Sequence, residues 1–219
     1  MTGGEDAGGT PPCLLHELDA QGAWTDRQQA QDVARWRKAE RERLLAARAA
    51  LDAVERTRIT ALIARDLDRL IPAQITGVVS AYWPIRAEPD LRPWMHARWS
   101  RGSRIALPVA TRLGEPLVFR EWAPHAPMAR GLWKIPYPAE GIEVVPAVVI
   151  APLVGFDAQC YRLGYGGGFF DRTLAGLDPR PLVLAVGYTA SELPTIYPQP
   201  HDIPMDWIVT GDRPPVGRA

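Results

Sequence analysis

The chain has 219 residues, of which 47% are hydrophobic, and its 25 Lys and Arg residues equal its 25 Asp and Glu residues in number. This length suits one sizeable domain, the zero net charge gives no argument for a nucleic-acid partner, and no apolar run reaches the roughly 18 residues of a membrane span. Because the N-terminus lacks the order of a secretory signal and the two cysteines, Cys13 and Cys160, are too few for a disulfide framework, we expect a cytoplasmic enzyme.

Two helices are expected near the N-terminus. Residues 1–24 are rich in Gly, Pro and small residues without periodicity and are expected to form a tail. Thr25 with Gln28 resembles a capping box, which predicts the start of a long charged helix. A second start signal at Asp52 begins a helix whose apolar spacing of three and four residues ends at Pro72.

These helices carry a local excess of positive charge between residues 35 and 69. Such an excess usually marks a solvated helix face. Arg37 and Arg41, however, lie one turn apart, so both side chains can reach the same anion.

Residues 77–82 are predicted to form the first strand of a parallel sheet, and a loop follows it. Loops at the carboxyl ends of parallel strands form the ligand crevice, which favours a binding role for Glu88. The alternative is that Glu88 and Asp90 merely favour the start of the helix expected over residues 91–101. The sequence leaves these two interpretations open.

Residues 131–138 hold two prolines and two aromatic residues and are expected not to form a helix. Within them, Trp133 either stacks on a flat ligand ring or fills the core. A proline-pinned segment over residues 191–206 is rigid enough to present Asp202 at a fixed place, whereas His201 is a less favoured acid–base group because it has no visible partner. Further strands are expected at residues 104–109, 117–122, 182–187 and 207–210.

The stretch with the strongest functional signal follows a buried, valine-rich strand predicted at residues 147–154. Residues 162–172 contain four glycines within five positions, flanked by two arginines and an aspartate. Phe170, Leu174 and Leu177 then recur at helical spacing, so the glycines are expected at a strand-to-helix turn. Glycines there allow backbone amides to crowd around a ligand. A tight surface turn is the alternative, but the pattern favours an anion-binding loop, with phosphate as the expected anion.

Two known glycine signatures do not fit this loop. A Walker loop needs Lys and then Ser or Thr after its last glycine, where this chain has Phe169 and Phe170. The dinucleotide fingerprint needs a glycine three residues after Gly166, where Phe169 stands. The predicted phosphate site must therefore take its positive charge from arginine or from a metal ion.

The order of these motifs resembles that of the 5-formyltetrahydrofolate cyclo-ligases, also called methenyltetrahydrofolate synthetases, over roughly residues 34–212. Its most specific part is the core Arg-Leu-Gly-x-Gly-x-Gly-aromatic-aromatic-Asp, which is far more specific than a generic glycine loop. The residues that carry the resemblance are Phe156-Asp157, residues 162–172, His201-Asp202, Asp206 and Ile208-Val209-Thr210, supported by Tyr82, Glu88, residues 133–136 and the basic helix.

The resemblance implies an α/β fold, a three-layer α/β/α sandwich with a mostly parallel sheet and a glycine-rich phosphate loop between a strand and a helix. We expect one domain over residues 25–212 and a C-terminal tail over residues 213–219. The implied reaction uses ATP and Mg²⁺ to convert 5-formyltetrahydrofolate into 5,10-methenyltetrahydrofolate, with release of ADP and phosphate. The expected partners are ATP and a folate, without nucleic acid or membrane, and the expected state is a monomer.

The resemblance also implies site residues. Arg37 stands where the family has a lysine, so the charge is kept but its geometry changes. The implied ATP site comprises Arg37, Arg41, Arg162, Leu163, Gly164, Tyr165, Gly166, Gly167, Gly168, Phe169, Phe170 and Asp171. The implied folate site comprises Trp83, Glu88, Trp133 and Tyr165, the implied Mg²⁺ ligands are Asp171 and Asp202, and no further catalytic residue is expected.

Three departures from the family pattern stand out. Cys160 replaces a glycine, residues 191–195 lack a glutamine expected there, and the N-terminal tail is long. The first two bear on the folate pocket, so the alternative function is an ATP-dependent enzyme of the same fold that acts on another formylated or phosphorylated metabolite. A non-enzymatic module whose basic helices bind RNA or a regulatory partner is a further alternative, and the zero net charge and the lack of interleaved aromatic residues on those helices count against it.

Overall fold

The computed structural model describes residues 27–72 and 76–218, so the predicted N-terminal tail and the Thr25 cap lie outside the described residues. The chain divides into two units, residues 1–36 and residues 37–219, and each is described by itself. The functional residues predicted above all belong to the second unit.

Helix α1 (Arg27–Ala50) begins in the first unit. There Gln28 Nε2 and the Arg35 guanidinium both donate to the Asp32 carboxylate, as expected for an exposed helix with residues three and four positions apart. None of the helices in residues 27–72 and 76–218 combines the length with the apolar character that crossing a membrane requires.

The core of the second unit is an eight-stranded sheet in the order β12-β11-β10-β7-β1-β2-β3-β6. The five central strands from β11 to β2 run parallel, and β12, β3 and β6 are antiparallel to their neighbours. The strands of this sheet are β1 (Val78–Ser80), β2 (Arg104–Val109), β3 (Val118–Trp122), β6 (Glu143–Val144), β7 (Pro146–Pro152), β10 (Leu182–Val186), β11 (Trp207–Val209) and β12 (Val216–Gly217). Two hairpins, β4 (Met128–Arg130) with β5 (Pro136–Pro138) and β8 (Gly155–Phe156) with β9 (Arg162–Leu163), lie outside it.

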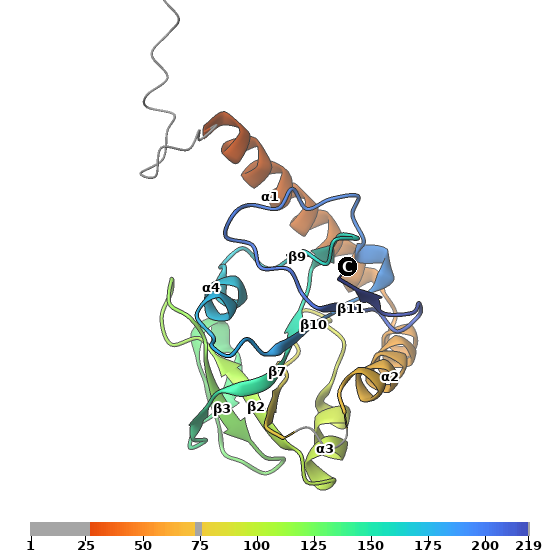
Figure 1. The fold of residues 1–219 in the computed structure, drawn as a ribbon. Coiled ribbons are helices and arrows are strands. Elements are labelled where there is room, and N and C mark those ends of the chain that lie inside the picture. Colours follow the sequence, from red (N-terminus) through yellow and green to blue (C-terminus); the bar gives the residue numbers. More distant parts are fainter. Residues whose placement is uncertain (1–26, 73–75, 219) are drawn as a thin grey trace, which may run out of the picture. The chain divides into compact units, whose positions relative to one another are not determined.

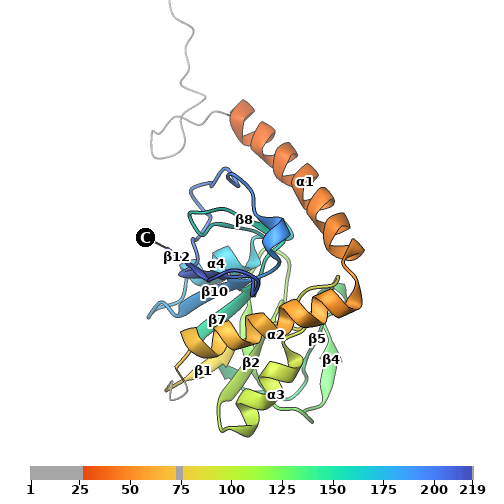
Figure 2. The ribbon, with the colours of Figure 1, turned by 90° about the vertical axis from the view of Figure 1, so that its right-hand side faces the viewer.

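Helices cover both faces of the sheet. On β10, Leu184 packs in the cluster that contains the buried residues of α2 (Ala53–Leu70) and α3 (Arg92–Ser100), whereas the adjacent Val183 packs in the cluster that contains Leu174 of α4 (Phe169–Ala175). This alternation follows from the two-residue period of a strand. Figures 1 and 2 show α4 on the opposite side of the sheet from α2 and α3. The three-layer α/β/α architecture predicted from the sequence is therefore confirmed.

The predicted central strands and helices are found, with boundaries shifted by one to three residues at some ends. The short strands β4, β5, β6, β8 and β9 were not predicted, and two of the expected segments differ from the structure. Residues 132–134 form a single 3-10 turn within a segment expected to lack helix, and Trp133 interrupts it at φ 53°. Residues 213–219, expected as a tail, contain β12, which pairs with β11 at the edge of the sheet.

The strand order reverses between β1 and β7. From β1 the chain crosses through α3 to β2 on one side, and from β7 it crosses through α4 to β10 on the other side. Because the two crossovers lie on opposite faces, their loops diverge at the carboxyl ends of β1 and β7. Open α/β sheets bind ligands at such a switch point.

Candidate functional site

A cavity of about 540 Å³ lies at this switch point. The ends of β1, β2 and β7 contribute to its wall through Tyr82, Val109 and Pro152. Every residue that the sequence placed at the ATP, folate or metal site lines it: Arg37, Arg41, Trp83, Glu88, Trp133, Arg162, Leu163, Gly164, Tyr165, Gly166, Gly167, Gly168, Phe169, Phe170, Asp171 and Asp202. Residues spread over 166 positions of the chain, from 37 to 202, therefore share one cavity.

The glycine-rich loop connects β9 to α4 along this wall. Gly166 has φ 96° and Gly168 has φ 62°, and both values lie in the left-handed region that favours glycine. Within the described residues, the amides of Gly166, Gly167 and Gly168 donate to no backbone carbonyl. The Nε of Arg41 donates to the Gly164 carbonyl oxygen over 2.7 Å and so ties the loop to α1. The loop thus presents free backbone donors beside an arginine.

Arg162 lies under the loop with only 4% of its side chain exposed. Its Nη2 donates to Oδ2 of Asp171 over 3.2 Å, and its guanidinium carbon lies 5.0 Å from the centre of the Phe170 ring. The buried Nε of Arg162 has no hydrogen-bond partner among the described residues. A buried donor without a partner is costly, which is consistent with a site completed by an anionic ligand.

Arg37 and Arg41 differ in how their guanidinium groups are used. Arg37 donates to the carbonyl oxygens of Ile196 and Tyr197, over 2.9 and 2.8 Å, and forms an ion pair with Asp202. Arg41 uses only its Nε in the hydrogen bonds described. Burial, and then repulsion from Arg37, lower the pKa of Arg41, and the negative charge of Asp202 offsets these two effects only in part.

The two aspartates expected to bind metal both line the cavity, and each is held by an arginine. Burial alone would raise the pKa of Asp202, but hydrogen bonds from Arg37 and the Gln199 amide keep that pKa below its ordinary value. Asp171 also accepts from the Ile203 amide over 3.3 Å. In the part of the chain that the structure describes, no group of three or more His, Cys, Asp or Glu side chains is positioned to hold a metal ion by itself.

Glu88 lies in the loop after β1 with 1% of its side chain exposed. Its Oε2 accepts from the Ile85 amide over 2.8 Å, and its Oε1 accepts from the Tyr165 hydroxyl over 2.7 Å. At the start of α3 it is Asp90 whose carboxylate accepts from the Arg92 amide. Glu88 therefore lines the cavity, whereas Asp90 is bonded to the start of α3, and the binding role of Glu88 stays a prediction.

Burial raises the pKa of Glu88, and the Ile85 amide, the Tyr165 hydroxyl and the charge of Arg48 partly offset this effect. Burial also raises the pKa of Tyr165 well above its ordinary value, so its hydroxyl stays protonated and available as a donor. Burial therefore disfavours the ionised form of Glu88, whereas the Ile85 amide, the Tyr165 hydroxyl and Arg48 favour it.

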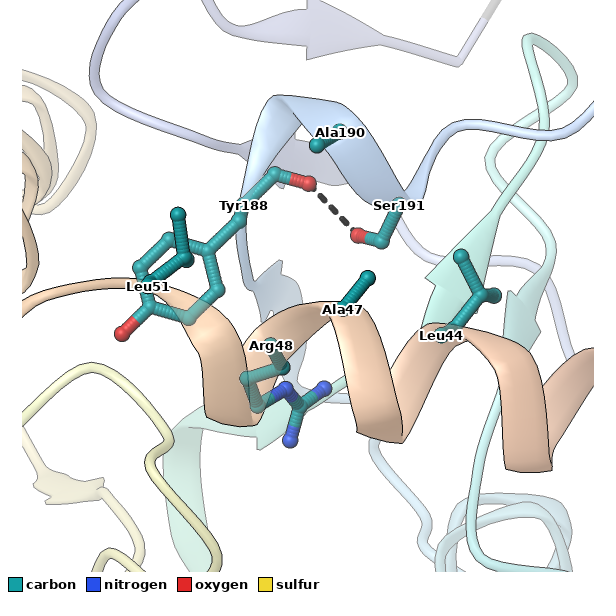
Figure 3. A pocket seen from close by; sticks show the side chains of 7 residues that line it. All are labelled: Leu44, Ala47, Arg48, Leu51, Tyr188, Ala190 and Ser191. Carbon is teal, nitrogen blue, oxygen red and sulfur yellow. Dashed lines mark hydrogen bonds between the residues drawn. The ribbon is translucent and has the colours of Figure 1, made fainter.

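The sequence analysis did not single out Arg48, which does not line the cavity of about 540 Å³ but contacts two residues that do, Glu88 and Tyr165. Its Nη1 donates to the Tyr165 hydroxyl over 3.1 Å, its Nη2 donates to the Leu153 carbonyl oxygen, and it lies 4.0 Å from Glu88. A signal was present, because Arg48 follows Arg41 by seven residues and so lies on the same face of α1. Arg48 also lines a small cavity of about 40 Å³. In Figure 3 its guanidinium is directed away from Ala190 and Ser191.

Aromatic side chains form part of the cavity wall. Trp133 is 62% exposed and meets the Phe169 ring edge to face, with 5.5 Å between the ring centres. Trp83 lies under the guanidinium of Arg92 at 5.3 Å. The core alternative for Trp133 is wrong, since this indole is exposed at the cavity. His201 also lines the cavity, with 76% of its side chain exposed and 4.0 Å from Asp202.

Comparisons with known proteins identify the family of this chain. The model of the 5-formyltetrahydrofolate cyclo-ligase family matches residues 33–211. The chain is 31% identical over 153 residues to the 5-formyltetrahydrofolate cyclo-ligase of Escherichia coli K12, covering 65% of this chain and 82% of that protein. It is 32% identical over 149 residues to the enzyme of the same name from Mycolicibacterium smegmatis, covering 64% and 77%.

Solved structures resemble it as well. The 5,10-methenyltetrahydrofolate synthetase of Aquifex aeolicus superposes with a TM-score of 0.68 at 27% identity, over 81% of this chain and 90% of that one. The synthetase of Mycoplasma pneumoniae superposes with a TM-score of 0.66 at 20% identity, over 80% and 98%, which supports the fold alone. Since the family match spans nearly all of the second unit, this chain belongs to the 5-formyltetrahydrofolate cyclo-ligase family.

Proposed function

We propose that this chain catalyses the ATP-dependent conversion of 5-formyltetrahydrofolate to 5,10-methenyltetrahydrofolate, with ADP and phosphate as the other products. The observation that carries the proposal is that one cavity at the switch point joins two kinds of wall. One kind is cationic and rich in glycine backbone, which suits a triphosphate. The other kind combines a buried carboxylate with indole rings, which suits a pterin.

The triphosphate would bind along the glycine-rich loop. The amides of Gly166, Gly167 and Gly168 are free to donate to phosphate oxygens, and the terminal nitrogens of Arg41 are free to form charge-assisted bonds. Arg162 adds a buried positive charge beneath the loop. Arg37 lines the same cavity, but its donors are committed to the protein, so it contributes charge and holds Asp202.

The residues present fit Mg²⁺. This ion prefers one or two carboxylates, with phosphate oxygens and waters completing its octahedron. Asp171 and Asp202 supply two carboxylates at the triphosphate wall, and each retains lone pairs beyond those used by the protein. Mg²⁺ held there would neutralise charge on the phosphate oxygens and align the terminal phosphoryl group.

The folate would bind with its pterin between the loop after β1 and the rim of the cavity. Glu88 can accept hydrogen bonds from the N–H groups of the pterin, and Trp83 and Trp133 offer flat apolar faces. Tyr165 belongs to both parts of the site, since it lies in the glycine-rich loop and donates to Glu88.

The chemistry explains why both ligands must share one cavity. A formamide oxygen is a poor leaving group, so it first takes the γ-phosphoryl group of ATP, and ADP leaves. N10 then attacks the formyl carbon and loses its proton, the phosphorylated oxygen departs as phosphate, and the ring is closed. The protein accelerates the first step mainly by positioning and by stabilising charge, and the second by holding the folate in a folded geometry.

The proposal is tested by mixing the purified chain with 5-formyltetrahydrofolate, ATP and Mg²⁺ and following the near-ultraviolet absorbance of the methenyl product. We expect product only when ATP is present, with one ADP formed for each methenyl group. Folded protein that gives no product at any enzyme concentration would refute the proposal. Hydrolysis of ATP at a rate indifferent to the folate would indicate a different acceptor.

The proposal also includes a monomeric enzyme located in the cytoplasm. Both substrates are small molecules, and every contact proposed for them comes from the lining of one cavity in a single chain. Light scattering during size-exclusion chromatography would test the monomer, and fractionation of cells that express the tagged chain would test the location.

A further inference from the structure

We infer that Arg48 is a positioning residue for this reaction: it holds the Glu88 carboxylate and the Tyr165 hydroxyl as one hydrogen-bonded unit at the wall of the cavity. The inference rests on the proposed function, because it assigns Arg48 a part in binding the folate. It concerns a residue that does not itself line the large cavity and acts through two that do.

The geometry around Arg48 connects four separate segments of the second unit. From α1, its Nη2 donates to the carbonyl oxygen of Leu153, just after β7, and its Nη1 donates to Tyr165 in the glycine-rich loop over 3.1 Å. Glu88, in the loop after β1, lies 4.0 Å away. Only 4% of the Arg48 side chain and 1% of the Glu88 side chain are exposed, so solvent screens this pair little.

The hydrogen-bond directions follow from the chemistry of these groups. A guanidinium has donors and no acceptor, so the Tyr165 hydroxyl must accept from Arg48 and is free to donate to Glu88. Glu88 accepts the hydrogen bond from Tyr165 on Oε1 over 2.7 Å and a hydrogen bond from the Ile85 amide on Oε2 over 2.8 Å. Both carboxylate oxygens are thereby oriented, and each keeps a lone pair for a donor on the ligand.

The charge of Arg48 also favours the ionised form of Glu88. Burial raises the pKa of Glu88, and the groups that face it are Arg48 from α1, Tyr165 from the glycine-rich loop, Arg86 from its own loop, Tyr82 at the end of β1 and Tyr188 after β10. Of the two cations among them, Arg86 is exposed and stacks over the Tyr165 ring at 5.5 Å, whereas Arg48 is buried. The low local dielectric makes the buried charge the stronger influence.

The positioning unit also links the two binding walls. Tyr165 belongs to the loop proposed to hold the triphosphate, and Glu88 belongs to the loop proposed to hold the pterin. Arg48 joins them to the central strand β7 through Leu153. Loss of Arg48 should therefore affect folate binding and its pH dependence more than ATP binding.

The test compares Arg48→Met with Arg43→Met in the assay of methenyl product. Arg43 lies on the same helix, is 57% exposed and, among the described residues, pairs only with Glu40, so its replacement is the matched control. We expect Arg48→Met to raise the KM for 5-formyltetrahydrofolate by about tenfold or more, since a buried carboxylate loses its partner, and to leave the KM for ATP nearly unchanged. Arg43→Met should change neither value.

A second readout separates positioning from a purely structural role. Glu88 must be ionised to accept from the pterin, so kcat/KM for the folate falls as the pH drops through the raised pKa of Glu88. Without Arg48 that pKa rises further, so in Arg48→Met the fall must begin at a higher pH. Arg48→Lys keeps the positive charge but lacks the planar set of guanidinium donors, so kcat/KM should fall at a pH between those of the wild type and Arg48→Met. In the Glu88→Gln background, Arg48→Met should add little.

A variant with fewer structural consequences covers the case in which Arg48→Met does not fold. Tyr165→Phe removes only the bridging hydroxyl. We expect it to raise the KM for the folate and to shift the fall of kcat/KM at acidic pH to a higher pH, as in Arg48→Met. Wild-type KM values and an unshifted fall of kcat/KM at acidic pH in the folded variants would overturn the inference while leaving the proposed function intact. An inactive wild-type chain would overturn both.

Discussion

Arg37 and Arg41 lie one turn apart on α1, and the sequence could not distinguish their tasks. Arg37 donates hydrogen bonds to two carbonyl oxygens and pairs with Asp202. These contacts, together called the clasp, attach the segment over residues 196–202 to the helix. Arg41 keeps its terminal nitrogens available for a ligand. The difference depends on where a segment more than 150 residues away folds back, which no local pattern encodes.

The first prediction concerns this clasp. In Arg37→Lys a single ammonium cannot reach two carbonyl oxygens and a carboxylate together, so we expect the free energy of unfolding to fall by about 1 to 3 kcal/mol. Thermal denaturation measures the loss. Lys38→Arg, at an exposed neighbouring position, is the control and should leave stability within the error of the measurement. A stability equal to the wild type in Arg37→Lys would show that the clasp is not formed in solution.

The second prediction concerns Asp171. In Asp171→Asn the amide oxygen can still accept from the Ile203 amide, so the fold should persist, with some loss of stability because the ion pair with the buried Arg162 is broken. The negative charge proposed to hold Mg²⁺ is also lost. We expect kcat to fall by roughly 100-fold, the size of effect seen when one group that stabilises transition-state charge is removed.

Exposed Asp178, which lies beyond α4 and outside the cavity, provides the matched control, and Asp178→Asn should keep full turnover. Circular dichroism should confirm that both variants fold. Unchanged turnover in Asp171→Asn would remove this carboxylate from the proposed metal site.

At the scale of elements, the glycine-rich loop shows how backbone conformation can serve binding. Gly166 has φ 96°, and a Cβ there would lie 3.4 Å from the guanidinium carbon of Arg41. Gly102, just after α3, has a similar φ of 89°, and no atom of the described residues lies within 4 Å of the added Cβ. The two positions therefore share the conformational requirement for glycine and differ in whether they face the proposed triphosphate.

The third prediction uses this contrast. Both Gly166→Ala and Gly102→Ala should destabilise the fold by about 1 kcal/mol, because alanine resists positive φ. Only Gly166→Ala should also raise the KM for ATP, since its methyl group crowds Arg41 and the adjacent amides. Melting temperatures and steady-state kinetics measured on both variants distinguish these effects. Equal KM values for ATP in the two variants would place the triphosphate elsewhere.

Elements buried on both faces were predictable, and short peripheral ones were not. The strands β2, β7 and β10 coincide with apolar runs in the sequence, as expected for strands of a parallel sheet that is buried on both faces. The hairpins β4–β5 and β8–β9 have two or three residues per strand, too few for a period to be recognised. The turn of the second hairpin depends on Asp157, whose carboxylate accepts from the amides of Tyr161 and the distant Ile196. Such long-range bonds leave no trace in local spacing.

The same limit applied to the site. Its cationic glycine loop could be predicted because phosphate binding needs free amides and positive charge close together in the chain. Arg48 and its contacts with Glu88 and Tyr165 were missed because those partners lie 40 and 117 residues away, although the spacing from Arg41 marked the correct face of α1. These three side chains come together when α1, the loop after β1 and the glycine-rich loop assemble around the sheet.

At the scale of the whole second unit, the strand order explains how one cavity can serve two substrates. Crossovers on opposite faces of the sheet open a crevice at the ends of β1 and β7. The loop after β1 supplies Glu88, and the connection after β7 supplies the glycine-rich loop. The account requires that these two loops bring the γ-phosphoryl group of ATP against the formyl oxygen of the folate, so that transfer between them is direct.

The most direct test of that claim follows the formyl oxygen itself. The chain is incubated with ATP, Mg²⁺ and 5-formyltetrahydrofolate that carries a heavy oxygen isotope in its formyl group, and the released phosphate is examined by mass spectrometry. The account predicts that each phosphate formed together with the methenyl product contains the labelled oxygen. Methenyl product accompanied by unlabelled phosphate would contradict it, because the formyl oxygen would then have left without ever receiving the phosphoryl group.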